Sequence, residues 1–178
     1  MSYTLALVQK AELTGGASSN RFNVSGWSLT AKIDGAGATD TIESTNDTNF
    51  VLTDALLTRA DGASFALTSI ENAVLTGGAS SNLFTVSGWS RTAKIDGAGN
   101  TDASISANDK DFVLGDSQMT RSDGAVFDLV AVEIAMLTGG ASANKFTVSG
   151  WTKGAILSGL GGTDTVVSTN DLSFSLTR

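Results

Sequence analysis

Three residue types are missing from the 178-residue chain, which contains no cysteine, no histidine and no proline. Without cysteine there is no disulfide framework and no thiolate chemistry. Without histidine, the commonest general base and the commonest zinc ligand are both absent. These absences close off most enzyme mechanisms, and we predict that the protein is not an enzyme.

Positive charge is also scarce, because 11 Lys and Arg face 18 Asp and Glu and leave a formal net charge of −7 at pH 7. Nucleic acids and anionic membranes select basic surfaces, so this balance disfavours both as partners and favours solubility and cations. No segment approaches the ~18 uninterrupted apolar residues of a membrane span. The opening MSYTLALVQKAELTGG lacks the pattern of a secretion signal. If the protein is exported, its signal lies outside this chain.

What the sequence does contain is a long internal repeat. LTGGASSNRFNVSGW at 13–27 returns as LTGGASSNLFTVSGW at 75–89 and as LTGGASANKFTVSGW at 137–151, which defines a constant 62-residue period. Trp27, Trp89 and Trp151 keep the same interval, which excludes insertions and deletions between them. We therefore interpret residues 1–178 as one domain with repeat units at 13–74 and 75–136 and partial units at 1–12 and 137–178.

The apolar residues inside each unit favour short β-strands. In pairs such as Phe22 and Val24, or Phe50 and Leu52, they alternate with polar residues, as in a strand with one buried face. Turns rich in Gly, Ser, Asn and Asp separate these pairs. No stretch keeps a helical period for three turns, and the strongest exception, residues 53–62, is interpreted as a longer loop.

The turns favour stacked coils over hairpins, because they are longer than the two-residue Asn-Gly or Asp-Gly loops of tight hairpins. Six strands per unit would give three coils per unit and about nine in the chain. The predicted fold is an all-β, right-handed parallel β-solenoid (a β-helix or β-roll), with apolar side chains stacked between two facing sheets.

The glycine-rich turns resemble a known family. GGASSNRFN at 15–23 is similar to the nonapeptide G-G-x-G-x-D-x-U-x of the repeats-in-toxin family, with Ser18 for the third glycine, Asn20 for aspartate and Phe22 as the large apolar residue. GAGATDTI at 35–42, GAGNTDASI at 97–105 and GLGGTDTV at 159–166 look like the same motif stretched by one residue. The resemblance implies a parallel β-roll with calcium between stacked turns.

Carried over residue by residue, the resemblance implies six possible calcium ligands: Asp40, Asp102 and Asp164, with Asn20, Asn82 and Asn144 as neutral substitutes. Asparagine supplies an oxygen without charge, whereas calcium prefers six to eight oxygens with several carboxylates among them. In the alternative interpretation, these side chains bond to backbone N–H groups of the turns, stack as ladders and bind no metal.

The tryptophans are candidates for ligand stacking. In equal register, Trp27, Trp89 and Trp151 would form one line along the rod, where exposed rings could stack on sugars. In the alternative interpretation, each covers a glycine corner or closes one end of the core. Regular Thr-x-Thr rows would suit ice binding, but Ala103 interrupts the row in the second copy.

The acidic residues recur with the repeat instead of gathering once at a cleft, which also argues against catalysis. The unit with its TVSGW segment is similar to the repetitive β-strand arrays of very large bacterial surface or secreted adhesin-like proteins. That resemblance implies an extracellular or cell-surface spacer, stalk or adhesive scaffold. Neither end of the chain has the pattern of a polar cap, so we expect end-to-end self-association or contact with neighbouring repeats of a longer chain.

Overall fold

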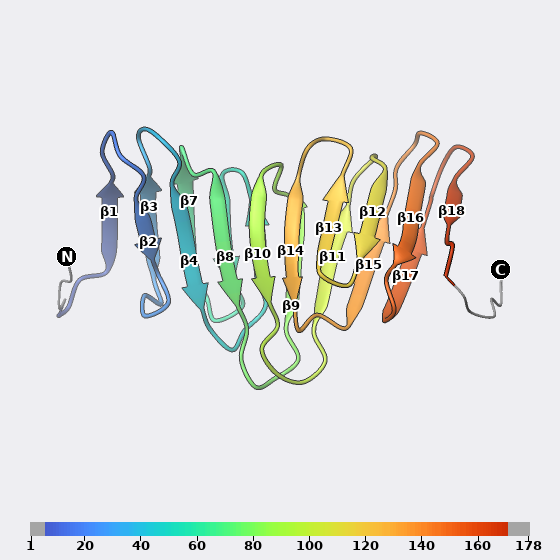
Figure 1. Ribbon diagram of the computed structural model, residues 1–178. Helices are drawn as coiled ribbons and strands as arrows, with labels where there is room; N and C mark the ends of the chain where they lie inside the picture. Colours follow the sequence, from blue (N-terminus) through green and yellow to red (C-terminus); the bar gives the residue numbers. More distant parts are fainter. Residues whose placement is uncertain (1–5, 171–178) are drawn as a thin grey trace.

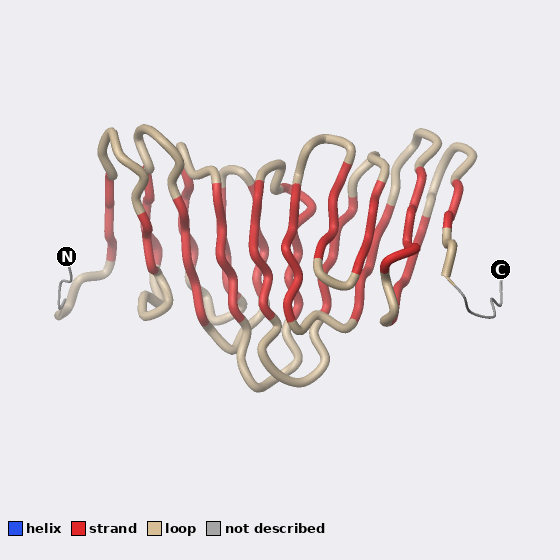
Figure 2. Tube along the Cα trace, viewed as in Figure 1, coloured by secondary structure: helices blue, strands red, loops and turns tan. Residues whose placement is uncertain are grey.

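The computed structural model describes residues 6–170, and all of its regular secondary structure there is β-strand. The strands form two nine-stranded sheets that face each other as the layers of one elongated array (Figures 1 and 2). Neither sheet closes on itself. The all-β prediction is confirmed. The prediction of uncapped ends concerns, in part, residues 1–5 and 171–178, which lie outside the described range.

Spatial order in the two sheets differs from chain order. The first sheet runs β1 (Lys10–Thr14), β3 (Thr30–Asp34), β7 (Ser64–Thr68), β6 (Leu56–Arg59), β5 (Phe50–Thr53), β9 (Leu83–Gly88), β11 (Ala103–Ala107), β15 (Ile134–Thr138) and β17 (Gly154–Ser158). The second runs β2 (Arg21–Asn23), β4 (Thr41–Thr45), β8 (Asn72–Thr76), β10 (Thr92–Asp96), β14 (Val126–Val130), β13 (Gln118–Arg121), β12 (Phe112–Gly115), β16 (Lys145–Gly150) and β18 (Thr165–Val167).

Most neighbouring strands are parallel, because the chain usually crosses to the opposite sheet after one strand and then returns in the same direction. β1 pairs with β3 in this way, with Lys10 opposite Thr30 and Leu13 opposite Ile33. Positions of β1 and β3 that are equivalent along the coil therefore lie side by side, and their inward side chains pack on one another across the sheet.

Two antiparallel strands correct the sequence prediction. β6 is antiparallel to both β5 and β7, and its counterpart β13 is antiparallel to both β12 and β14. The segment 53–62 is therefore not a longer loop, and the sheets are mixed instead of purely parallel. The physical reason is that Leu57 and Arg59 alternate inward on β6 and are both buried, while Asp54 and Ala55 make a hairpin turn that needs no glycine.

Each 62-residue interval contains seven strands, not the six predicted, as the run from β3 to β9 shows. Because β5, β6 and β7 stay in one sheet, the chain crosses between the sheets five times from β3 to β10, and this odd number of crossings places corresponding strands of successive intervals in opposite sheets. β3 belongs to the first sheet, its counterpart β10 to the second, and β17 to the first again. Sequence-equivalent residues therefore alternate between the two faces of the protein. Handedness and coil count stay predictions.

The core lies between the sheets and is made of laterally stacked side chains. Phe50 of β5 stacks on Phe84 of β9 with ring centroids 5.3 Å apart and an interplanar angle of 9°. Their counterparts, Phe112 and Phe146, repeat the arrangement at 5.4 Å and 4°. Parallel pairing places Phe50 opposite Phe84 and Phe112 opposite Phe146, before the register shifts further along each pair, and this brings the aromatic rings face to face.

Candidate functional site

Polar side chains of neighbouring loops are joined into ladders at the ends of the strands. In the first ladder, the main-chain N–H of Asn20 donates to Asp40 Oδ1 at 2.6 Å. The N–H of Asp40 in turn donates to Glu71 Oε2 at 2.9 Å. Three loops, after β1, β3 and β7, are therefore linked by hydrogen bonds between positions distant in sequence.

A second ladder links four loops. Asn82 Nδ2 donates to Asp47 Oδ1 at 3.2 Å, and the Asn82 N–H donates to Asp102 Oδ1 at 2.6 Å. The Asp102 N–H then donates to Glu133 Oε2 at 3.0 Å. The hydrogen bond from Asn82 holds the pKa of Asp47 below its ordinary value, because that bond favours the ionised carboxylate.

The third ladder repeats the pattern. Asn144 Nδ2 donates to Asp109 Oδ1 at 3.1 Å, and the Asn144 N–H donates to Asp164 Oδ1 at 2.8 Å. The structure therefore brings together the six predicted ligand residues in three pairs. The other members were missed by sequence reasoning, although the 62-residue spacing of Asp47 from Asp109, and of Glu71 from Glu133, could have found them.

One carboxylate oxygen in each of the first two ladders has no hydrogen-bond donor. Asp40 and Asp102 are fully buried, and the Oδ2 atom of each has no partner among residues 6–170. Burial raises the pKa of Asp102 above its ordinary value. A Cβ atom on Gly97 would lie 2.0 Å from the Ala131 carbonyl oxygen and 2.5 Å from Asp102 Oδ2. Two acceptors therefore converge on Gly97, a position that only glycine can occupy without displacing them.

A carboxylate oxygen without a donor beside a carbonyl oxygen favours a proton or a cation between them, and calcium is the candidate cation. The atom type suits calcium, because both atoms are oxygens. The number of available oxygen ligands is too low, because Asp102 Oδ1 already accepts the Asn82 N–H and calcium takes six to eight oxygens. Within the described range, no group of three or more His, Cys, Asp or Glu side chains could hold a metal ion. The contacts match the ladder interpretation more closely than a calcium cage.

A buried arginine in the second repeat donates hydrogen bonds to several segments that are distant in sequence. Arg121 on β13 donates through Nη1 to the Val86 carbonyl at 3.2 Å, to Ser106 Oγ at 3.1 Å and to Asn108 Oδ1 at 2.8 Å. Its Nη2 donates to the Trp89 carbonyl. One guanidinium therefore ties the antiparallel strand to β9, to β11 and to the residues that directly follow each of them. Its charge is balanced by Asp123, 3.1 Å away at the edge of the core.

The first repeat contains the same clamp. Arg59 donates to the carbonyls of Val24 and Trp27, to Ser44 Oγ and to Asn46 Oδ1. Both guanidinium groups also sit over aromatic rings, 5.5 Å from the centroids of Phe65 and Phe127 respectively. Sequence reasoning missed these arginines because it assigned their segment to a loop. The available signal was the recurrence of Arg-x-Asp-Gly at 59–62 and 121–124.

The tryptophans are not an exposed line, and the ligand-stacking interpretation loses its premise. Trp89 is 0% exposed and Trp151 5%, while Trp27 is half-buried. Each indole N–H donates to the carbonyl three residues ahead, as from Trp89 to Thr92 at 3.1 Å. Trp27 and Trp151 follow strands of the second sheet, whereas Trp89 follows a strand of the first. The geometry corresponds to side chains that cover corners of the core.

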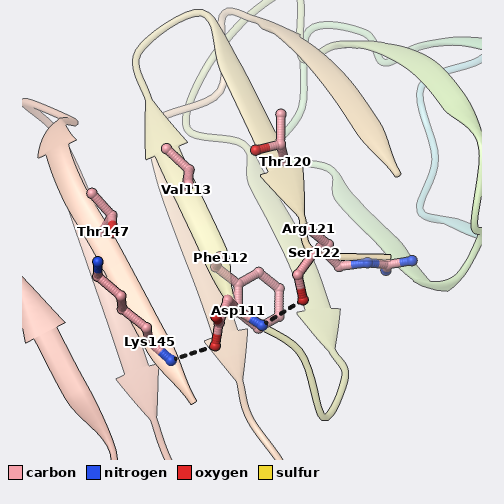
Figure 3. Close-up of a pocket in the computed structure, with 8 residues that line it drawn as sticks. All are labelled: Asp111, Phe112, Val113, Thr120, Arg121, Ser122, Lys145 and Thr147. Carbon is pink, nitrogen blue, oxygen red and sulfur yellow. Dashed lines mark hydrogen bonds between the residues drawn. The ribbon is translucent and has the colours of Figure 1, made fainter. Parts of the chain in front are cut away.

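A shallow hollow of about 300 Å³ lies over β12, β13 and β16 (Figure 3). Within it, Asp111 Oδ1 accepts the main-chain N–H of Lys145 at 2.8 Å, and the Asp111 N–H donates to Ser122 Oγ at 3.1 Å. These bonds again join neighbouring loops.

Comparison of the chain with protein-family models, with curated proteins and with solved structures gives no match. The residues the structure describes contain no helix that could cross a membrane.

Proposed function

We propose that the chain is a non-enzymatic structural segment, acting as spacer, stalk or adhesive scaffold, of a bacterial extracellular or surface protein. We further propose that its two sheets form a right-handed β-solenoid of 62-residue repeats. The observation that carries the proposal is the use of the buried polar groups. The guanidinium groups of Arg59 and Arg121 and the carboxylates of Asp40 and Asp102 all bind loops distant in sequence.

The duplication of these contacts supports a mechanical role over a chemical one. A catalytic centre occurs once, whereas each clamp and ladder recurs one repeat further along the chain with the equivalent partners. Cross-links between loops resist the separation of neighbouring strands, and the benefit of such links increases with every copy. A chain selected for stiffness would accumulate them in this way.

Force spectroscopy tests this function directly. The chain would be held near residues 6 and 170 and extended, with Arg121→Met as the weakened variant and Arg21→Met as the surface control. We expect cooperative rupture of the wild type and the control at similar force, and rupture of the Arg121 variant at clearly lower force. Gradual extension of the wild type at negligible force would contradict the scaffold function.

Calcium binding at the ladders is the second candidate, carried by the donor-free Oδ2 atoms of Asp40 and Asp102 beside backbone carbonyls. On this proposal, calcium raises the melting temperature and chelator lowers it, and Asp102→Asn reduces the response. Calorimetric titration with calcium, with circular dichroism before and after chelation, checks both effects. An unchanged melting temperature in chelator would eliminate this candidate and leave the scaffold proposal intact. Sugar and ice binding are supported by no contact in the described residues.

A further inference from the structure

Among residues 6–170, each end of the array has two edge strands, β1 and β2 at one end and β17 and β18 at the other (Figure 1). Within that range β1 pairs only with β3, in the first sheet, and β18 pairs only with β16, in the second sheet. An edge strand presents a row of N–H and C=O groups that can pair with another strand. Each end of the array therefore offers a backbone template.

Side-chain exposure shows that β1 lacks a neighbour that its counterparts have. Leu13 on β1 is 45% exposed, whereas the equivalent Leu75 on β8 and Leu137 on β15 are 0% and 1% exposed. The residue type and the pattern of alternation are the same in all three strands. The difference is that β8 and β15 have a parallel strand on each side, whereas β1 has one on a single side.

The chain itself contains the pairing that would join the β1 edge to the β18 edge. β18 is the counterpart of β11 one repeat later, and β1 is the counterpart of β15 two repeats earlier. β11 and β15 are parallel neighbours, with Ala103 opposite Ile134 and Ile105 opposite Met136. The two free edges are therefore repeats of two strands that already bind each other inside the molecule.

We propose that the β18 end of one copy of this chain binds the β1 end of a second copy in the register of the β11–β15 pair. This inference rests on the proposed scaffold function and adds its partner, a second copy. Translating the β11–β15 register places Thr165 opposite Lys10, Val166 opposite Ala11 and Val167 opposite Glu12. The contact joins two different surfaces, so it does not close on itself and extends into a filament.

The pair Val167 and Glu12 gives a test that is specific for this register. Both are expected on the outer face, where Ile105 and Met136 form the equivalent internal pair. Glu12 already pairs with Lys10 Nζ at 2.8 Å and lies 3.5 Å from Lys32 Nζ. Val167→Glu would place a second carboxylate beside it, and like charges directly opposite each other on paired strands are unfavourable. The two lysines offset part of this repulsion, so we expect the variant to associate about twofold more weakly than the wild type.

Charge reversal across the joint should restore binding. Glu12→Lys, mixed with Val167→Glu, brings opposite charges together beside Lys10 and Lys32, so the mixture should associate about fivefold more tightly than Val167→Glu alone. The double variant Val167→Glu with Glu12→Lys should regain self-association close to that of the wild type. Thr85→Glu introduces the same charge on the inner strand β9 and should leave association unchanged.

Sedimentation velocity over a range of protein concentrations measures these effects, with circular dichroism as the check on folding. Concentration-dependent growth of the wild type, weakening by Val167→Glu and rescue in the mixture would support the proposal. A wild type that stays monomeric with its β spectrum and cooperative unfolding intact would overturn the joint but leave the scaffold function standing. Association that is insensitive to both charge changes would overturn the register and the proposal with it. Loss of cooperative unfolding in the wild type would instead contradict the scaffold function.

Discussion

Replacing Arg121 with methionine is the sharpest test of how the array is held together. Methionine keeps much of the apolar bulk of the side chain but removes all of its donors. The carbonyls of Val86 and Trp89, with Ser106 Oγ and Asn108 Oδ1, would then lose a partner inside the protein. The contact between the guanidinium and the Phe127 ring would also be lost.

The magnitude follows from burial, because the arginine side chain is only 1% exposed and water cannot replace it freely. Leaving a buried polar group unsatisfied costs about 1–3 kcal/mol, and breaking a buried charge-assisted network costs about 3–5 kcal/mol. We therefore expect Arg121→Met to lower the free energy of unfolding by about 4 kcal/mol. That loss is a large part of the ~5–15 kcal/mol that stabilises a typical domain.

Denaturation in guanidinium chloride, followed by circular dichroism, measures this loss. Hydrogen exchange should also become faster at the amides of residues 86–89, which lie in the clamped segment. Arg21→Met is the matched control, because that side chain is 71% exposed and its surface ion pair with Glu43 contributes at most about 1 kcal/mol. If Arg121→Met costs no more than Arg21→Met, the guanidinium is not the clamp that the geometry indicates.

Three further predictions address the ladders. Asp102→Asn should stabilise the protein at pH 7, because ionisation of a carboxyl whose pKa is raised in the folded state opposes folding. In unfolding measurements this gain should shrink as the pH falls towards 3.8 and vanish well below it, where the carboxyl is protonated in both states. Gly97→Ala should cost about 3 kcal/mol through the 2.0 Å contact with a backbone carbonyl, whereas Gly26→Ala, with nothing within 4 Å, should change the denaturation midpoint little. The hydrogen bond from Asn144 lowers the pKa of Asp109, so the ionised carboxylate stabilises the fold. Asp109→Ala should therefore destabilise the protein fully at pH 7 and progressively less as the pH falls below 3.8. Chemical unfolding at several pH values measures this change.

Local patterns in the sequence were sufficient to predict the strand-rich fold. Pairs such as Phe50 with Leu52 and Phe65 with Leu67 alternate with polar residues, and all four side chains are buried on one face of their strands. Burying one face of a strand imposes a period of two whatever the strand pairs with, so this signal does not depend on the partner. The all-β class could therefore be predicted without knowing the topology.

The antiparallel strand could not be predicted in the same way, because one of its inward residues is Arg59. A positive charge between Thr58 and Ala60 has the pattern of a loop until its partners are known. Those partners, including the Val24 carbonyl and Ser44 Oγ, belong to segments well before it in the chain. The seventh strand of each interval, and with it the exchange between sheets, depends on such distant contacts.

For the candidate site residues, too, local sequence patterns predicted some features, while others depend on contacts between distant segments. The resemblance of the glycine-rich turns to the nonapeptide motif singled out Asn82, Asp102, Asn144 and Asp164 as individual residues. Their hydrogen bonding in pairs is a finding of the structure that the sequence did not predict. It could not show that Trp89 is buried, since a ring at the end of a strand can point inward or outward with the same neighbours in sequence. Solvent exposure of a single side chain is decided by packing, which local sequence does not record.

The odd number of sheet crossings per repeat determines how many binding sites a longer chain of the same repeats would present on each face. A surface feature carried once per repeat appears on a given side only at every second copy, because β3, β10 and β17 alternate between sheets. Two receptors on the same membrane would then meet sites two repeats apart, while the intervening site faces away. Such an assembly would present the same feature on two opposite faces. It could then bridge two opposing surfaces without a separate binding module for each surface.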